Sequence, residues 1–154
     1  MDSIQKAALE SLVDRSLTAQ EVADIDQLLP VRNDVAIAAV LSDGRTRLQS
    51  HMIGIGTILA CMKAEGLAGG EFLDALKALG NTNRDVYWIM TNIERGALDM
   101  GESATQESVV ELKPAFASWS AGLDRLLALG RVADPIHYNA VSDALNIAEG
   151  RLTL

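Results

Sequence analysis

Apolar residues recur at intervals of three or four positions along most of the chain, which is the spacing of amphipathic helices. The clearest stripe lies within residues 83–95 and consists of Val86, Ile89, Met90 and Ile93. Asn81 or Asn83 is suited to cap the start of this helix, and Gly96 is suited to end it. We expect this to be the middle helix of the protein, with shorter helices packed around it.

Further helices are indicated by the same spacing or by short, nearly all-apolar runs. They cover residues 3–15, 18–30, 34–41, 57–62, 72–80, 103–112, 114–130 and 137–150. Glycine, proline or an Asp-Gly pair separates most of these segments, as is typical of turns. With the helix at residues 83–95 these are nine candidate segments, of which we expect six to eight to form short helices in an all-α fold.

Two kinds of local signal refine this picture. Thr18–Glu21 and Ser103–Gln106 both match the capping-box pattern that opens a helix. Asp43–Leu48 and Glu149–Leu154 both follow a helix at a glycine and then favour an extended chain. Either these two segments pair as a small two-stranded β-ribbon, or they share only a Gly-Arg pair that is common after helices.

Composition supports one helical domain spanning residues 1–154. A chain of 154 residues buries roughly 70% of its unfolded surface, which is enough for a core without disulfides. Only 4% of the residues are aromatic, whereas 49% are hydrophobic, so the core must consist of aliphatic side chains and methionine. Such side chains favour helix-on-helix packing over a sheet rich in rings and β-branched residues.

The charge of the chain limits its partners. Its net charge of −8 repels nucleic-acid phosphates, so we expect no direct binding to DNA or RNA. The acids stand at scattered single positions rather than in the dense runs of a nucleic-acid mimic. The N-terminus lacks the pattern of a secretory signal, and no apolar run approaches about 18 residues, so we expect neither secretion by a signal peptide nor contact with a membrane.

The residues that usually carry chemistry do not form a recognisable pattern. His51 and His137 are far apart and lie outside any metal-binding frame, and Cys61 has apolar neighbours. The loop at Gly54 and Gly56 either offers backbone amides to a phosphate or is a flexible helix start, since the further residues of a nucleotide-binding fingerprint are missing. We therefore expect no catalytic, cofactor-binding or metal-binding residues, no cofactor and no enzymatic activity.

A second face of the helix at residues 83–95 is a candidate for contact with a partner. Trp88 and Asn92 lie off the apolar stripe and four positions apart, and Tyr87 adds a second ring. Trp88 either seals a neighbouring helix or anchors a partner protein. Arg45 and Arg47 are also candidates, because guanidinium groups pair readily with a partner's carboxylates.

Several stretches, taken in order, resemble small uncharacterised proteins encoded in the virion structural modules of tailed bacteriophages. The stretches are Gly44–Leu48, Ile53–Ile58, Val86–Met90, Ile93–Gly96 and Leu98–Thr105. The resemblance covers most of the chain, roughly residues 17–149. It rests on turns and core positions, it implies a role in the virion or its assembly, and it supplies no catalytic residues.

The expected function follows from the resemblance and from the missing catalytic patterns. We expect a non-enzymatic bacteriophage virion-associated structural or assembly protein, a head (capsid) or tail accessory subunit that acts through protein–protein contacts. Its expected partners are other virion proteins or further copies of itself in a homo-oligomer, and its expected location is the virion, or the host cytoplasm during assembly. The alternative is a soluble acidic phage protein that binds and regulates a host protein.

Overall fold

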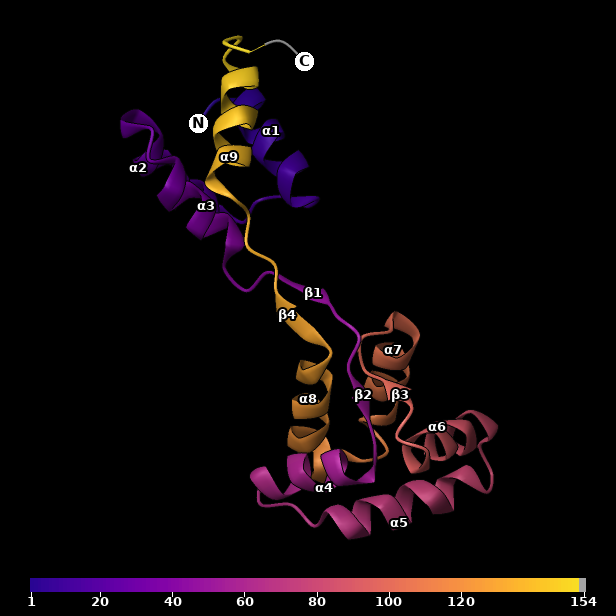
Figure 1. Ribbon diagram of the computed structural model, residues 1–154. Coiled ribbons are helices and arrows are strands. Elements are labelled where there is room, and N and C mark those ends of the chain that lie inside the picture. The colour runs from indigo at the N-terminus through magenta and orange to yellow at the C-terminus, as the bar shows by residue number, and fades with distance from the viewer. Residues whose placement is uncertain (153–154) are drawn as a thin grey trace. The chain divides into compact units, whose positions relative to one another are not determined.

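The computed structural model describes residues 1–152 and is predominantly helical (Figure 1). The α-helices are α1 (Ser3–Val13), α2 (Ala19–Leu28), α3 (Asp34–Ser42), α4 (Ile55–Ala64), α5 (Gly69–Gly80), α6 (Arg84–Glu94), α7 (Ser103–Leu112), α8 (Ser120–Leu129) and α9 (Tyr138–Ala148). The all-α character is confirmed, but the nine α-helices of the described residues exceed the predicted six to eight. All nine candidate segments contain a helix, and α3, for example, begins where the Asn33 side chain accepts a hydrogen bond from the Ala36 amide. None of the helices within residues 1–152 has the length and apolarity needed to cross a membrane.

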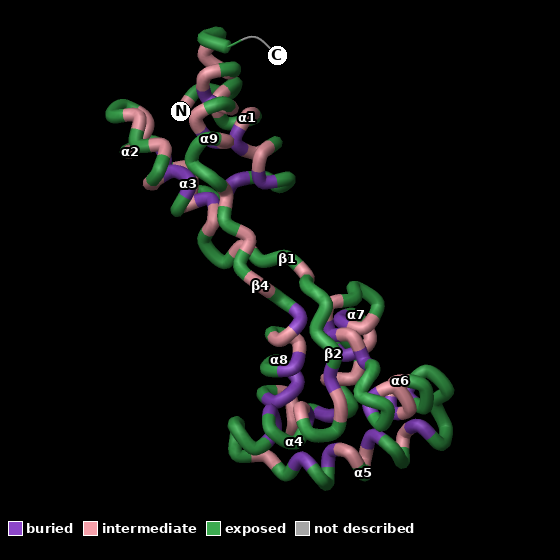
Figure 2. Tube along the Cα trace, viewed as in Figure 1, coloured by how far each residue is buried: buried purple, intermediate pink, exposed green. Residues whose placement is uncertain are grey.

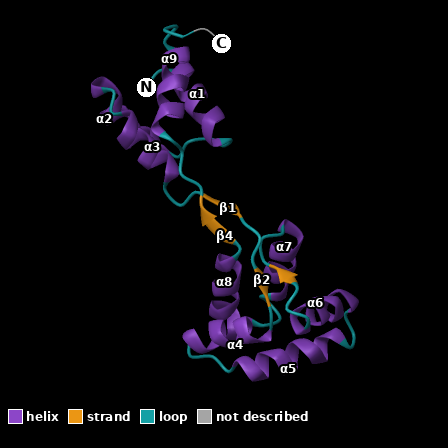
Figure 3. Ribbon diagram, in the orientation of Figure 1, coloured by secondary structure: helices purple, strands orange, loops and turns teal. Residues whose placement is uncertain are grey.

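The remaining regular elements are short. Two 3₁₀ helices are present, η1 (Leu29–Val31) and η2 (Ala117–Trp119). The strands are β1 (Thr46–Leu48), β2 (Met52–Ile53), β3 (Leu98–Asp99) and β4 (Arg131–Ala133), and they form two separate two-stranded sheets (Figure 3). In one sheet β2 pairs antiparallel with β3, so that Ile53 lies opposite Leu98.

The predicted β-ribbon has the right first strand and the wrong partner. Thr46–Leu48 is a strand, but it pairs with β4 and not with the segment after α9. Arg151 and Leu152 form a bend, and the rest of the predicted second strand lies outside the described residues. The predicted partner fails because local extended preference does not determine which segments meet.

The chain divides into two compact units, each with its own buried apolar cluster (Figure 2). We call residues 1–46 with 133–154 the terminal unit and residues 47–132 the central unit. In the terminal unit, α9 packs on α1 and α3, and α2 packs on α3. In the central unit, α5 packs on α6, and α4 packs on α5 and α8. That both units form one domain stays a prediction.

The terminal unit contains the capping box that the sequence predicts. The Thr18 hydroxyl accepts a hydrogen bond from the Glu21 amide at 3.2 Å, and the Glu21 carboxylate accepts one from the Thr18 amide at 2.8 Å. Arg15 also donates to Glu21, at 2.6 and 2.9 Å. The Arg15 guanidinium and the hydrogen bond from the Thr18 amide to the carboxylate lower the pKa of Glu21 to about 2.

In the central unit, the backbone of Gly130 passes very close to Met100. A Cβ atom on Gly130 would lie 1.8 Å from the Met100 carbonyl oxygen, and one on Gly101 would lie 2.2 Å from the Gln49 carbonyl oxygen. Only glycine fits at such distances, and the close approach lets the Gln49 amide donate to the Gly130 carbonyl at 2.9 Å. This crossing fixes the segment between β3 and α7, on which the candidate site depends.

Candidate protein-contact site

Helix α6 has two different faces. Val86, Met90 and Ile93 are buried in the core of the central unit, as the sequence predicts, while Ile89 lies half-buried at the edge of that stripe. The neighbouring face carries Asp85, Trp88, Ile89 and Asn92, at positions i, i+3, i+4 and i+7. These positions lie on one side of an α-helix, so the local fold alone brings the four side chains into one row.

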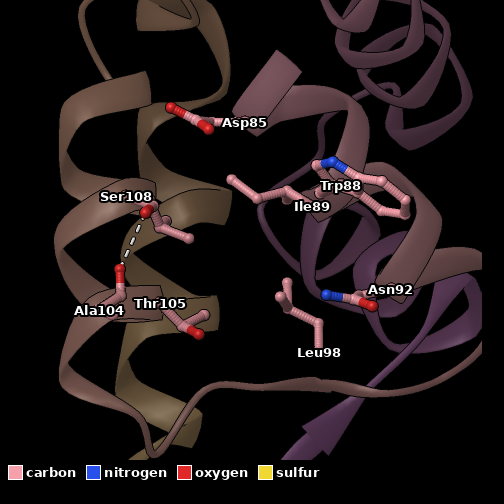
Figure 4. A pocket seen from close by; sticks show the side chains of 9 residues that line it. Asp85, Trp88, Ile89, Asn92, Leu98, Ala104, Thr105 and Ser108 are labelled. Carbon is pink, nitrogen blue, oxygen red and sulfur yellow. Dashed lines mark hydrogen bonds between the residues drawn. The ribbon is translucent and has the colours of Figure 1, made fainter. Parts of the chain in front are cut away.

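This row forms one wall of a groove between α6 and α7, with a volume of about 250 Å³ (Figure 4). The opposite wall is formed by Ala104, Thr105 and Ser108 of α7. Leu98 of β3 and Val109 of α7 are buried and form the apolar floor. We call this feature the α6/α7 groove.

The wall formed by α7 is held in place by Gln106, whose side chain is buried on the other side of that helix. The Gln106 amide donates to the carbonyls of Met100 at 2.7 Å and Leu127 at 3.0 Å, and it accepts from Arg131 at 3.1 Å. The predicted capping box at Ser103–Gln106 is therefore wrong, since Glu102 precedes α7 without a side-chain cap. A buried amide gains more from three internal partners than from one capping contact.

Trp88 and Tyr87 form an exposed aromatic pair beside the groove. Their rings meet edge to face at 5.2 Å, and 47% and 50% of the two residues, respectively, are exposed. The guanidinium of Arg84 lies 5.8 Å from the centre of the Trp88 ring, within the range of a cation–π contact. A second hollow of about 540 Å³ lies on the other side of this pair, lined by residues 80–82, Arg84, Tyr87 and Trp88. Trp88 therefore lies between two hollows, and within the described part of the central unit no neighbouring helix covers it.

The polar groups of the groove are poorly paired within the described residues. The Ser108 hydroxyl donates to the Ala104 carbonyl at 2.8 Å (Figure 4). The side chains of Asp85, Asn92 and Thr105 make no hydrogen bond or ion pair within residues 1–152. Asp85 is also the only charged residue among those that line the groove. The groove thus combines an apolar floor with one unpaired carboxylate and two unpaired polar groups.

The other predicted contact residues lie elsewhere. Arg45 belongs to the terminal unit, where it donates to Asp134 at 3.0 Å and to the Val13 carbonyl at 3.2 Å. These bonds give Arg45 a structural role. Arg47 is exposed on β1 and does not line the groove. Of the five predicted residues, the structure places Trp88 and Asn92 in the groove and Tyr87 beside it.

Two of the groups considered for chemistry, Cys61 and Gly54, are packed against other parts of the central unit. Cys61 is buried in α4, and burial raises the pKa of its thiol. A Cβ atom on Gly54 would lie 3.1 Å from the Gly96 Cα, so the helix start at Gly54 packs closely against another backbone segment. Within the part of the chain that the structure describes, no three His, Cys, Asp or Glu side chains are grouped to hold a metal ion.

Asp85, Ile89 and the α7 wall were not identified from the sequence. The signal for Asp85 and Ile89 is present, because both share the helical face of Trp88 and Asn92. The α7 wall has no such signal, since only the tertiary packing brings α7 opposite α6.

Searches with the whole chain find no matching family model, curated protein or solved structure.

Proposed function

We propose that this protein is a non-enzymatic, virion-associated structural or assembly protein of a tailed bacteriophage, and that it acts through protein–protein contacts. The observation that supports contact most strongly is the exposed Tyr87–Trp88 pair beside the open α6/α7 groove. Tryptophan, tyrosine and arginine are the residue types that most often dominate the binding energy of interfaces. The phage origin rests on the sequence resemblance alone.

The size of this surface fits a protein used in many copies. Covering the exposed half of each of these two residues removes about 100–120 Å² from water, worth about 3 kcal/mol per residue as an upper bound. Association costs about 4–15 kcal/mol before any net binding appears. One such contact is therefore weak, and a repeated array, in which each copy makes several weak contacts, suits it better than a single tight complex.

Quantitative mass spectrometry of purified particles tests the proposal. The wild-type chain is expected at a fixed ratio to the major structural proteins, and a Tyr87→Ser/Trp88→Ser variant is expected to be lost from the particles while remaining folded by circular dichroism. A Val110→Ser variant is the matched control, because Val110 is 53% exposed and lies on α7 outside the groove lining. Particles that lack the wild-type chain would refute a virion role.

A second candidate function, regulation of a host protein, is favoured by the uneven distribution of charge. The terminal unit has five basic and eleven acidic residues, a net charge of −6, whereas the central unit has eight basic and ten acidic residues, a net charge of −2. A hollow of about 580 Å³ between α2 and α3 is lined by Glu21, Asp24 and Asp43, among others. A chain that is absent from particles and co-purifies with one host protein, with the complex lost in an Asp24→Asn/Asp43→Asn variant, would favour this candidate.

A further inference from the structure

We infer that the α6/α7 groove binds a segment of a partner protein that presents an aliphatic side chain next to a lysine or arginine. This inference rests on the proposed function, because it names the chemistry of the partner in the same contact. Its three supports are the size of the groove, its apolar floor and its single unpaired charge.

The size of the groove fits side chains better than a small molecule. Its volume of about 250 Å³ is below the roughly 300–1,000 Å³ that small-molecule sites occupy. The floor of Leu98 and Val109, with Ile89 of the α6 wall beside it, offers an aliphatic surface, while Trp88 forms a rigid rim on one side. A partner's leucine, isoleucine or methionine inserted there would cover the floor and part of the Trp88 ring.

The charge of the groove favours a basic residue next to the partner's aliphatic side chain. The Asp85 carboxylate is exposed at the α6 wall and has no partner within the described residues (Figure 4). The nearby Arg84 lines the other hollow, and its guanidinium lies over the Trp88 ring. A lysine or arginine of the partner would pair with Asp85, whereas a partner's acid would meet an uncompensated like charge. The central unit, which contains the groove, has a net charge of −2 and so does not repel basic segments.

The unpaired polar groups determine the orientation of a segment bound in the groove. The Asn92 amide and the Thr105 hydroxyl stand on opposite walls of the groove (Figure 4). Each is available to the backbone or a polar side chain of a bound segment. A segment lying along the groove would thus meet an acid at the Asp85 end and neutral hydrogen-bonding groups beside Asn92 and Thr105.

The test selects peptides from a surface-display library of random 16-residue sequences against the intact protein. Ala104→Trp and Thr105→Phe, both of which fill the groove, serve as separate counter-selection targets after circular dichroism shows that they fold. Peptides that bind wild type but neither filled variant are expected to be enriched in an aliphatic residue near lysine or arginine. No groove-dependent peptides, or groove-dependent peptides enriched in acids, would overturn the inference.

Binding constants of the selected peptides then test the role of Asp85. We expect Asp85→Asn to weaken binding about fivefold at low salt, with a smaller effect at high salt because ions screen the pair. Asp74→Asn is the matched control, since Asp74 is an exposed acid on α5 away from the groove, and it is expected to change binding less than twofold. Equal effects of the two variants would overturn the assignment of Asp85.

The outcomes separate this inference from the proposed function. If Tyr87→Ser/Trp88→Ser is lost from particles but the library yields no groove-dependent peptides, the proposed function stands and the groove is not the contact. If light scattering shows a wild-type oligomer that Ala104→Trp dissociates, a second copy occupies the groove and the basic-segment partner is refuted.

Discussion

A substitution of Gly130 by alanine should destabilise the central unit strongly. The added Cβ would lie 1.8 Å from the Met100 carbonyl oxygen and 2.3 Å from its carbonyl carbon, where at least about 3 Å is required. The backbone segments must therefore separate by more than about 1 Å. That movement stretches the Gln49–Gly130 hydrogen bond of 2.9 Å and the Gln106–Met100 bond of 2.7 Å.

The size of the effect follows from these separate contributions. Overpacking of a tight contact costs about 1–3 kcal/mol, and each weakened hydrogen bond costs about 1 kcal/mol. Alanine also lowers the conformational entropy of the unfolded chain, which offsets about 0.5–1 kcal/mol of this destabilisation. The free energy of unfolding should thus fall by about 3 kcal/mol, which lowers the melting temperature by about 6–12 °C for a chain of this size.

Urea unfolding, followed by tryptophan fluorescence, measures this change, because Trp88 and Trp119 both belong to the central unit. Gly56→Ala is the matched control, since a Cβ atom at this position in α4 meets nothing within 4 Å. Alanine favours helix, so this variant should be more stable than wild type by about 0.5 kcal/mol. A Gly130→Ala protein within about 1 kcal/mol of wild type would refute the close backbone approach.

Three further predictions concern buried polarity, acid stability and exposure. Gln106→Ala leaves two backbone carbonyls without their side-chain donor, so the free energy of unfolding measured in urea should fall by about 2–4 kcal/mol. A decrease below about 1 kcal/mol would contradict the buried network. Because folding lowers the pKa of Glu21 to about 2, the stabilisation that its carboxylate provides is complete above pH 4.5 and is lost as the pH falls toward 2. In circular dichroism melts, the melting temperature of Glu21→Gln should therefore fall less steeply with decreasing pH than that of wild type. Equal slopes for the two proteins would argue against the pair with Arg15. Acrylamide should quench the fluorescence of Trp88 more strongly than that of Trp119, because Trp119 packs on two phenylalanine rings. Trp88 is measured in the Trp119→Phe variant and Trp119 in the Trp88→Phe variant. The reverse order would place Trp88 in a covered site.

Local sequence patterns predicted the elements that local interactions determine. The spacing of Val86, Met90 and Ile93 is enough to place α6 and its buried face. The Thr18 capping box needs only four neighbouring residues, and it forms as predicted. In both cases the contacts that stabilise the element lie within one or two helical turns.

Features that depend on distant contacts could not be predicted in this way. Gln106 has the spacing of a capping residue, but Met100, Leu127 and Arg131 give its amide three better partners. The partner of β1 is likewise fixed by packing rather than by its own residues. For the same reason the sequence indicated the α6 wall of the groove and gave no sign of the α7 wall.

Photo-crosslinking from position 88 tests most directly whether the protein acts through the Tyr87–Trp88 surface. The photoreactive residue p-benzoylphenylalanine replaces Trp88 in cells that assemble the particles, and it replaces Asp74 in a control. The account predicts that irradiation joins position 88, but not position 74, to a virion protein or to a second copy of the chain. Crosslinks from position 74 with none from position 88 would contradict a contact at this surface.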